Sequence, residues 1–180
     1  MKLRKILAFL AATALGTVGA VAISTPAHAD YCAWVAIKSK ENGKYVSVEM
    51  NYTGSNYGML RARADSIGGW ERFLLCQYAT VIIGAPIYFT TLKSAANGKF
   101  VAAEWGYSGL QNGMLRARSS SLGPWEKFQI DSGHNPCAFM TLTVMKYTST
   151  EVNRTGIEYA MLRARSDVWG PWEKYEVVAA

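Results

Sequence analysis

The sequence predicts an all-β fold built from one unit that is written three times. A five-residue motif, Met-Leu-Arg-Ala-Arg, occurs at 59–63, 114–118 and 161–165. A second motif, Gly-x-Trp-Glu followed by a basic and an aromatic residue, occurs downstream of each copy, at 68–73, 123–128 and 170–175. Beyond the first thirty residues no long stretch has the 3.6-residue apolar period of a helix. Repetition of this length indicates a symmetric architecture.

The copies keep one register from end to end. They are offset by 55 residues from the first to the second and by 47 from the second to the third, without gaps inside a unit. The eight extra residues of the first offset fall between copies, in the apolar stretch Cys76–Pro86. The predicted repeats are therefore about 30–76, 77–131 and 132–180.

Each copy predicts four short strands. In the first copy they are close to Trp34–Ser39, Lys44–Glu49, Gly58–Arg63 and Glu71–Leu75. Asn-Gly pairs at 42–43 and 97–98 are strong hairpin signals between the first two strands. The third copy has Val144-Met145 at this place, so we expect a different turn there. Along the third strand, alternation puts Leu60 and Ala62 on one face and Met59, Arg61 and Arg63 on the other.

Twelve strands in three equal sets are compatible with few architectures. A propeller typically needs four or more blades, and an open solenoid needs capping units. A closed barrel capped by three hairpins uses every strand and removes exposed sheet edges. The predicted fold is an all-β β-trefoil with three pseudo-symmetric four-stranded repeats.

The motifs also carry a family resemblance. The combination of Asn-Gly-Lys-Tyr/Phe-Val-x-x-Glu, Leu-Arg-Ala-Arg and Gly-x-Trp-Glu-x-Phe resembles the fascin-like branch of the β-trefoils over nearly the whole chain after residue 30. The third copy departs most, because it lacks Asn-Gly-Lys. Resemblance to fascins implies protein (actin) binding, whereas related domains attached to bacterial glycan-degrading enzymes imply carbohydrate binding. The fold alone does not choose between these functions.

Residues 1–29 are predicted to be a secretory signal peptide. A basic head, Met1–Lys5, precedes an apolar stretch, Ile6–Ile23, and the segment ends in an A-x-A cleavage pattern at Ala27-His28-Ala29. An uncleaved membrane anchor is the alternative, because the apolar stretch is only slightly shorter than a bilayer span. Cleavage would leave one secreted domain, residues 30–180, with no further contact with the membrane.

Charge and cysteine content limit the partners. Without Lys2, Arg4 and Lys5 the formal net charge falls from +6 to +3, which is too small to indicate nucleic acid. Three cysteines in an exported chain predict one disulfide and one remaining thiol. If the first strand of copy one pairs antiparallel with its fourth, Cys32 lies close to Cys76, which favours that bridge. Cys137 would then stay reduced or link a homodimer.

Catalytic and metal chemistry have little support. His134 is the only histidine after the signal segment, so neither a Ser-His-Asp triad nor a zinc site is expected. The repeated glutamates are spread by symmetry rather than paired across one cleft, as glycosidase chemistry requires. No phosphate loop or dinucleotide fingerprint occurs. We expect a protein without catalytic residues, metal or cofactor.

The repeated side chains have both structural and functional interpretations. Trp70, Trp125 and Trp172 are predicted to be buried and to plug the barrel against its cap; a binding role is the alternative. The repeated acids, Glu49, Glu104 and Glu151, recur together with two arginines per copy. Paired charges that tie the strands together explain this pattern, and an anion-binding stripe is the alternative. The six arginines are Arg61, Arg63, Arg116, Arg118, Arg163 and Arg165.

The loops between the second and third strands (50–58, 105–113 and 152–160) diverge between copies and combine aromatic rings with amides. Sugar recognition needs this combination, because a ring stacks on the sugar face while amides bind its hydroxyls. Trp105 is the predicted stacking platform, with Tyr107 and Asn112 beside it. Weaker copies are Tyr52 with Asn51 and Tyr159 with Asn153; Tyr159 has the alternative of packing under its hairpin.

These features favour a secreted, non-catalytic module that binds carbohydrate, either polysaccharide or cell-wall glycan. The alternative is a fascin-like domain that binds protein. We expect Trp105→Ala to weaken glycan binding with little loss of stability, and Trp125→Ala to do the reverse.

Overall fold

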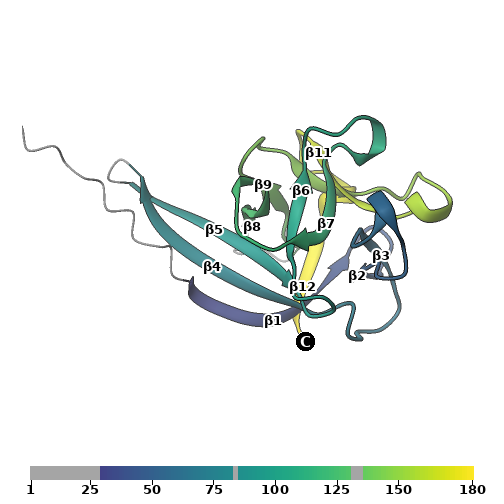
Figure 1. The fold of residues 1–180 in the computed structure, drawn as a ribbon, viewed down its shortest axis with the longest axis horizontal. Helices are drawn as coiled ribbons and strands as arrows, with labels where there is room; N and C mark the ends of the chain where they lie inside the picture. The colour runs from purple at the N-terminus through teal and green to yellow at the C-terminus, as the bar shows by residue number, and fades with distance from the viewer. Residues whose placement is uncertain (1–28, 83–84, 131–135) are drawn as a thin grey trace, which may run out of the picture.

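A computed structural model describes residues 29–82, 85–130 and 136–180 and contains twelve strands in three sets of four (Figure 1). The first set is β1 (Ala29–Ser39), β2 (Tyr45–Val48), β3 (Leu60–Ala64) and β4 (Phe73–Ile82). The second is β5 (Ala85–Ser94), β6 (Phe100–Glu104), β7 (Met114–Ser119) and β8 (Phe128–Ile130). The third is β9 (Phe139–Thr141), β10 (Tyr147–Thr150), β11 (Leu162–Ser166) and β12 (Tyr175–Ala179).

The remaining regular structure is short. Five three-residue 3-10 turns connect the strands: η1 (Gly54–Asn56), η2 (Gly109–Gln111), η3 (Pro124–Glu126), η4 (Gly156–Glu158) and η5 (Pro171–Glu173). The described part of the chain contains no α-helix, so the all-β prediction is confirmed. Nor does it contain a helix of the length and apolarity that crossing a bilayer requires. The predicted signal peptide lies outside the described residues except for Ala29, the first residue of β1.

The first and fourth strands of each repeat form a barrel. Antiparallel pairs join β1 to β4, β4 to β5, β5 to β8, β8 to β9 and β12 to β1. An antiparallel bridge between Cys137, just before β9, and Tyr175 of β12 completes the ring. The remaining strands form three hairpins, β2–β3, β6–β7 and β10–β11, which cap the barrel. This is the predicted β-trefoil arrangement.

The barrel core is filled by the aromatic residue that opens each fourth strand. Phe73, Phe128 and Tyr175 are each 0% exposed. The Tyr175 hydroxyl lies 3.1 Å from the hydroxyl of Thr150 and donates to the carbonyl of Thr148 at 3.2 Å. Burial raises the pKa of Tyr175 well above its ordinary value, so this phenol stays neutral.

The hairpins meet around the three-fold axis. Met59, Met114 and Met161 form a second buried cluster there. Met59 and Arg61 lie on the face of the third strand opposite Leu60 and Ala62, as the alternation predicts, and they are 1% and 8% exposed. Loops of another repeat cover this face.

The loops that cover the third strands make a closed ring of contacts between the repeats. The first arginine of each Leu-Arg-Ala-Arg motif donates to loop carbonyls of another repeat: Arg61 to Tyr159 and Gly156, Arg116 to Ser55, and Arg163 to Asn112 and Gly109. Main-chain bonds run the same way, from Ala62 to Ala160, Ala117 to Gly58 and Ala164 to Gly113. Each repeat therefore donates hydrogen bonds to one neighbouring repeat and accepts them from the other.

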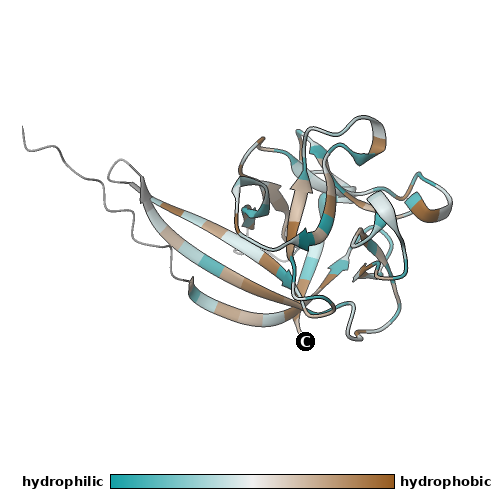
Figure 2. Cartoon of the chain, viewed as in Figure 1, coloured by the Kyte–Doolittle hydropathy of each residue, from teal (hydrophilic) through white to brown (hydrophobic). Residues whose placement is uncertain are grey.

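β4 and β5 continue beyond the barrel, together with the start of β1 (Figure 1). We call this extension, residues 29–34, 76–82 and 85–91, the arm. Figure 2 colours it mostly white to brown, and the sequence between Leu74 and Leu92 contains no Asp, Glu, Lys or Arg. The fourth strand was expected to end at Leu75. The eight extra residues of the first offset lengthen it instead.

The disulfide prediction is confirmed, since Cys32 and Cys76 are directly opposite in the β1–β4 pair and are bonded. Cys137 is 4% exposed, and its thiol donates to the carbonyl of Tyr175 at 3.5 Å. A link between two molecules through Cys137 would require the barrel to open.

The hairpin turn of the third repeat matches the other two. Gly43 and Gly98 have left-handed φ values of 69° and 65°, and Met145 adopts the same conformation at 52°. The Met145 N–H donates to Thr141 at 3.0 Å, as the Gly43 N–H does to Ser39 at 3.0 Å. The expectation of a different turn is wrong, because hydrogen bonding at both ends of the turn imposes the left-handed conformation on methionine.

This strain predicts that Met145→Gly stabilises the protein. A non-glycine residue in the left-handed region costs about 1 kcal/mol or more, and the greater freedom of glycine in the unfolded chain offsets part of the gain. We expect the free energy of unfolding in urea to rise by about 0.5 kcal/mol. Gly98→Ala should lower it as the matched control. A loss of stability for Met145→Gly would contradict this account of the turn.

Candidate functional site

A buried carboxylate ends or follows the second strand of every repeat. Glu49, Glu104 and Glu151 are 2%, 1% and 0% exposed. The second arginine of each motif binds its own glutamate: Arg63 binds Glu49, Arg118 binds Glu104 and Arg165 binds Glu151. The predicted Arg–carboxylate pairs are thus confirmed, and the arginines do not form an unpaired anion-binding stripe.

These contacts shift the arginine pKa values in different directions. The hydrogen bond to Glu49 raises the pKa of Arg63. Burial alone would lower the pKa of Arg118, but the hydrogen bond and charge of Glu104 outweigh it and raise the pKa. Arg163 donates to carbonyl oxygens instead, and burial lowers its pKa. Arg118 therefore stays fully charged at the site described below.

A second buried carboxylate belongs to each Trp-Glu box. Glu71, Glu126 and Glu173 are 8%, 6% and 5% exposed. One oxygen of each accepts the backbone N–H of the glycine three residues earlier, at 2.8 Å from Gly68, 2.6 Å from Gly123 and 2.8 Å from Gly170.

The other oxygen of this carboxylate distinguishes the second repeat. Glu71 Oε1 accepts from the Ser47 hydroxyl at 2.5 Å, and Glu173 Oε1 accepts from Ser149 at 2.6 Å. The equivalent residue in the second repeat is Ala102, which has no hydroxyl. Among the described residues nothing donates to Glu126 Oε1.

The repeated tryptophans are not barrel plugs. Trp125 is 38% exposed, and Trp70 and Trp172 are half-buried. The predicted burial is wrong, because the aromatic residue three positions later fills the barrel. Each tryptophan lies instead outside the core, beside the third-strand arginines.

The contacts between the second arginine of each motif and the tryptophan of its repeat differ among the three repeats. The guanidinium of Arg63 lies 6.0 Å from the ring centroid of Trp70, and that of Arg165 lies 5.7 Å from Trp172. Arg118 lies 5.8 Å from the ring of Tyr107 instead and donates to its hydroxyl at 2.7 Å. In the described structure no guanidinium covers Trp125.

The loop before β7 explains the position of Tyr107. In the first repeat the equivalent Tyr52 packs against the methionine cluster, and its hydroxyl accepts from Arg61 at 2.7 Å. In the second repeat Gly106 adopts a φ of 95°, a conformation that side chains other than glycine rarely reach. The turned backbone leaves Tyr107 38% exposed and beside Arg118.

These departures from symmetry coincide with a cavity of about 260 Å³, which we call the second-repeat pocket. It is lined by Ala102, Glu104, Arg118, Ser119, Trp125 and Glu126. The lining combines an aromatic ring, an available carboxylate oxygen and a charged donor. Such a set can hold a small ring that has an apolar face and hydroxyl groups at its edge.

The residues predicted for the main site, Trp105, Tyr107 and Asn112, do not line this pocket. Trp105 is half-buried against the core, and its indole N–H is buried without an acceptor in the described structure. The expectation that it is an exposed platform, dispensable for packing, is therefore wrong. The Tyr107 hydroxyl accepts a hydrogen bond from Arg118, while the Asn112 side-chain oxygen is buried.

The predicted weaker sites are dispersed. Tyr52 is half-buried on the methionine cluster, Asn51 and Asn153 are exposed on separate loops, and Tyr159 is 40% exposed. None of them lines the second-repeat pocket. The sequence did contain a signal for that pocket, the alanine at 102 in place of Ser47 and Ser149. No group of three or more His, Cys, Asp or Glu among the described residues could hold a metal.

Comparison with known proteins defines the fold. No protein-family model and no curated protein sequence matches the chain. The solved structures that match include ThreeFoil, a designed three-fold symmetric protein, with 17% identity, a TM-score of 0.61 and coverage of 82% of this chain and 99% of that one. The Rhizoctonia solani agglutinin matches with 11% identity, a TM-score of 0.58 and coverage of 88% and 99%.

A third match is part of a larger protein. The GlcNAcα1-4Gal-releasing endo-β-galactosidase from Clostridium perfringens matches with 12% identity and a TM-score of 0.57, over 83% of this chain but only 33% of the enzyme. Another matching structure is described as the BEL β-trefoil, at 10% identity and a TM-score of 0.56. At these identities the likeness shows the fold, and that fold is the β-trefoil.

The charge cluster predicts a large effect of Glu104→Gln. The substitution leaves the buried guanidinium of Arg116 (side chain 3% exposed) without its counter-charge. Breaking one half of a buried pair typically costs 3–5 kcal/mol, so we expect a loss of about 3 kcal/mol in urea unfolding. Asp167→Asn, which removes the exposed partner of Lys146, should cost less than about 1 kcal/mol. Equal small losses would show that the buried pair does not hold the repeat together.

Proposed function

We propose that this protein is an exported, non-catalytic carbohydrate-binding module whose second-repeat pocket binds one sugar ring of a polysaccharide or cell-wall glycan. One observation carries the proposal. In the second repeat no guanidinium covers Trp125, because Arg118 contacts Tyr107 instead. Glu126 also has no serine donor, because Ala102 stands where the other repeats have serine. The other two repeats keep both partners.

Trp125, Glu126 and Arg118 each have a role in binding a sugar. The exposed face of Trp125 can stack on the C–H face of a pyranose. Glu126 Oε1 can accept a sugar hydroxyl, and a hydrogen bond to a charged acceptor is stronger than one between neutral groups. Arg118 can donate from the opposite side. A cavity of about 260 Å³ suits one ring, whereas a protein partner would need a broad surface.

Two further facts support the proposal. One structural neighbour is named an agglutinin, and another is named for the disaccharide that it releases. The Cys32–Cys76 disulfide agrees with the predicted signal peptide, because disulfides persist in oxidising compartments outside the cytosol.

Binding to insoluble cellulose, chitin, xylan and bacterial cell walls tests the pocket. Trp125→Ala should reduce the affinity for the bound polymer about tenfold, the effect of losing one stacking ring. Its melting temperature should change little, because the side chain is 38% exposed. Trp172→Ala, the equivalent change in the third repeat, should leave binding intact.

Ala102→Ser is the complementary variant. It restores the hydroxyl that the other repeats supply to this carboxylate, so Glu126 should bind it and lose affinity for the sugar without loss of stability. Unchanged binding by both Trp125→Ala and Ala102→Ser would refute the site. Co-sedimentation with filamentous actin, run in parallel, should be negative; sedimentation with actin would favour the fascin-type alternative.

A further inference from the structure

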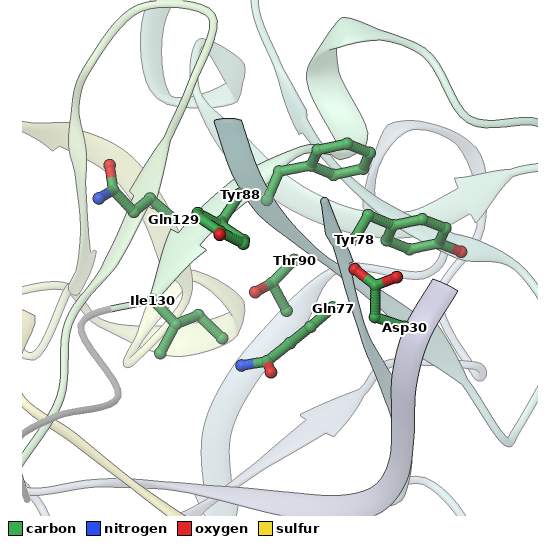
Figure 3. Close-up of a pocket in the computed structure, with 8 residues that line it drawn as sticks. Asp30, Gln77, Tyr78, Tyr88, Thr90, Gln129 and Ile130 are labelled. Atoms are coloured by element: carbon green, nitrogen blue, oxygen red, sulfur yellow. The ribbon is translucent and has the colours of Figure 1, made fainter. Parts of the chain in front are cut away.

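A larger cavity, of about 340 Å³, lies where the arm meets the barrel beside β8. Thr90 of β5 pairs with Phe128 of β8 at this junction. Figure 3 shows Gln77 and Tyr78 from β4, Tyr88 and Thr90 from β5, Gln129 from β8 and Asp30 from β1 around it. We call this cavity the arm pocket.

The arm pocket belongs to the insertion rather than to the repeat. β4 and β5 have ten residues each, whereas β8 and β9, at the next junction between repeats, have three each. Within the described ranges, the strands that build its outer wall therefore have no counterpart at that junction. Its lining is not dictated by three-fold packing.

The walls of the pocket are held in place. The ring of Tyr78 stacks on Phe89 with 4.9 Å between centroids and 2° between planes, and the ammonium of Lys127 lies 4.8 Å from the Phe89 ring centroid. One carboxylate oxygen of Asp30 accepts the Ala79 N–H at 2.8 Å. The Cys32–Cys76 disulfide fixes β1 against β4 close to Asp30. A preformed wall of this kind binds without a large ordering cost.

The polar groups of the lining suit an uncharged, hydroxylated ring. Gln77 and Gln129 present exposed amides, which both donate and accept, and Asp30 keeps one carboxylate oxygen available. Tyr88 is 68% exposed and offers a ring face at the rim. No Lys or Arg is among the lining residues, so the lining offers no side-chain cation to pair with phosphate, sulfate or uronate groups.

We infer that the arm pocket is a second saccharide site, selective for neutral sugar units. Tyr88 is its stacking ring, and Gln77, Gln129 and Asp30 bind the hydroxyl groups. The inference rests on the proposed function for the class of ligand only, because the pocket shares no lining residue with the second-repeat pocket. Two sites on one chain would let the protein hold two segments of a polymer and so increase its effective affinity.

Titration calorimetry on a Trp125→Ala background isolates the arm pocket. The probes are cellohexaose, chitohexaose, xylohexaose and a galactan hexasaccharide, with hexagalacturonate as the anionic control. We expect at least one neutral probe to bind with one molecule per chain and hexagalacturonate not to bind. Adding Tyr88→Ala and Gln129→Ala should weaken that binding at least tenfold.

Tyr31→Ala is the matched control, because Tyr31 is a 60% exposed aromatic residue of the arm that does not line the pocket. It should leave binding unchanged, and melting curves should show all variants folded. The inference is overturned if the Trp125→Ala protein binds none of the neutral probes, or if adding Tyr88→Ala and Gln129→Ala leaves their affinity unchanged. The proposed function fails by a different result, unaltered polymer binding by both Trp125→Ala and Ala102→Ser.

Discussion

The rest of the trefoil depends on the buried carboxylate at the end of each second strand and the third-strand arginine that binds it. An unpaired buried carboxylate would cost several kcal/mol, so every repeat must carry both partners. This requirement explains why Glu49 and Arg63 recur together at equivalent positions. The other arginine of the motif, Arg61 in the first repeat, lies 3.7 Å from the same carboxylate and also donates to the loop of another repeat, which closes the ring.

The repeated carboxylate–arginine pairs also limit where a ligand site can form. Residues that recur in all three repeats serve packing or charge pairing. A ligand site must therefore come from positions where one repeat differs from the other two. Ala102, Gly106 and Tyr107 are such departures. Together they leave Trp125 without a covering guanidinium and one oxygen of Glu126 without a donor among the described residues, while the Arg118–Glu104 pair stays intact. The insertion that builds the arm is a departure of another kind, since it adds strand length between repeats.

Repetition made the fold predictable from the sequence, because three copies in register specify strand number, pairing and the Cys32–Cys76 bridge. The sites were less predictable. Whether Trp125 is exposed depends on which ring Arg118 covers, and periodicity holds no information about that contact. Trp105 is half-buried because it packs over Gly113, a contact set by the φ values of its loop. The stretch after Leu75 has no charged residue up to Leu92, so its composition gave no sign that β4 continues past the barrel.

The central claim is that ligand binding occurs where the second repeat departs from the other two. Nuclear magnetic resonance of the indole N–H groups during titration with a bound oligosaccharide tests this most directly. The chain has six tryptophans, so each signal can be assigned by single substitution. The account predicts that the Trp125 signal shifts with saturation while those of Trp70 and Trp172 stay in place. Equal shifts of all three, or a Trp125 signal that does not move, would contradict it.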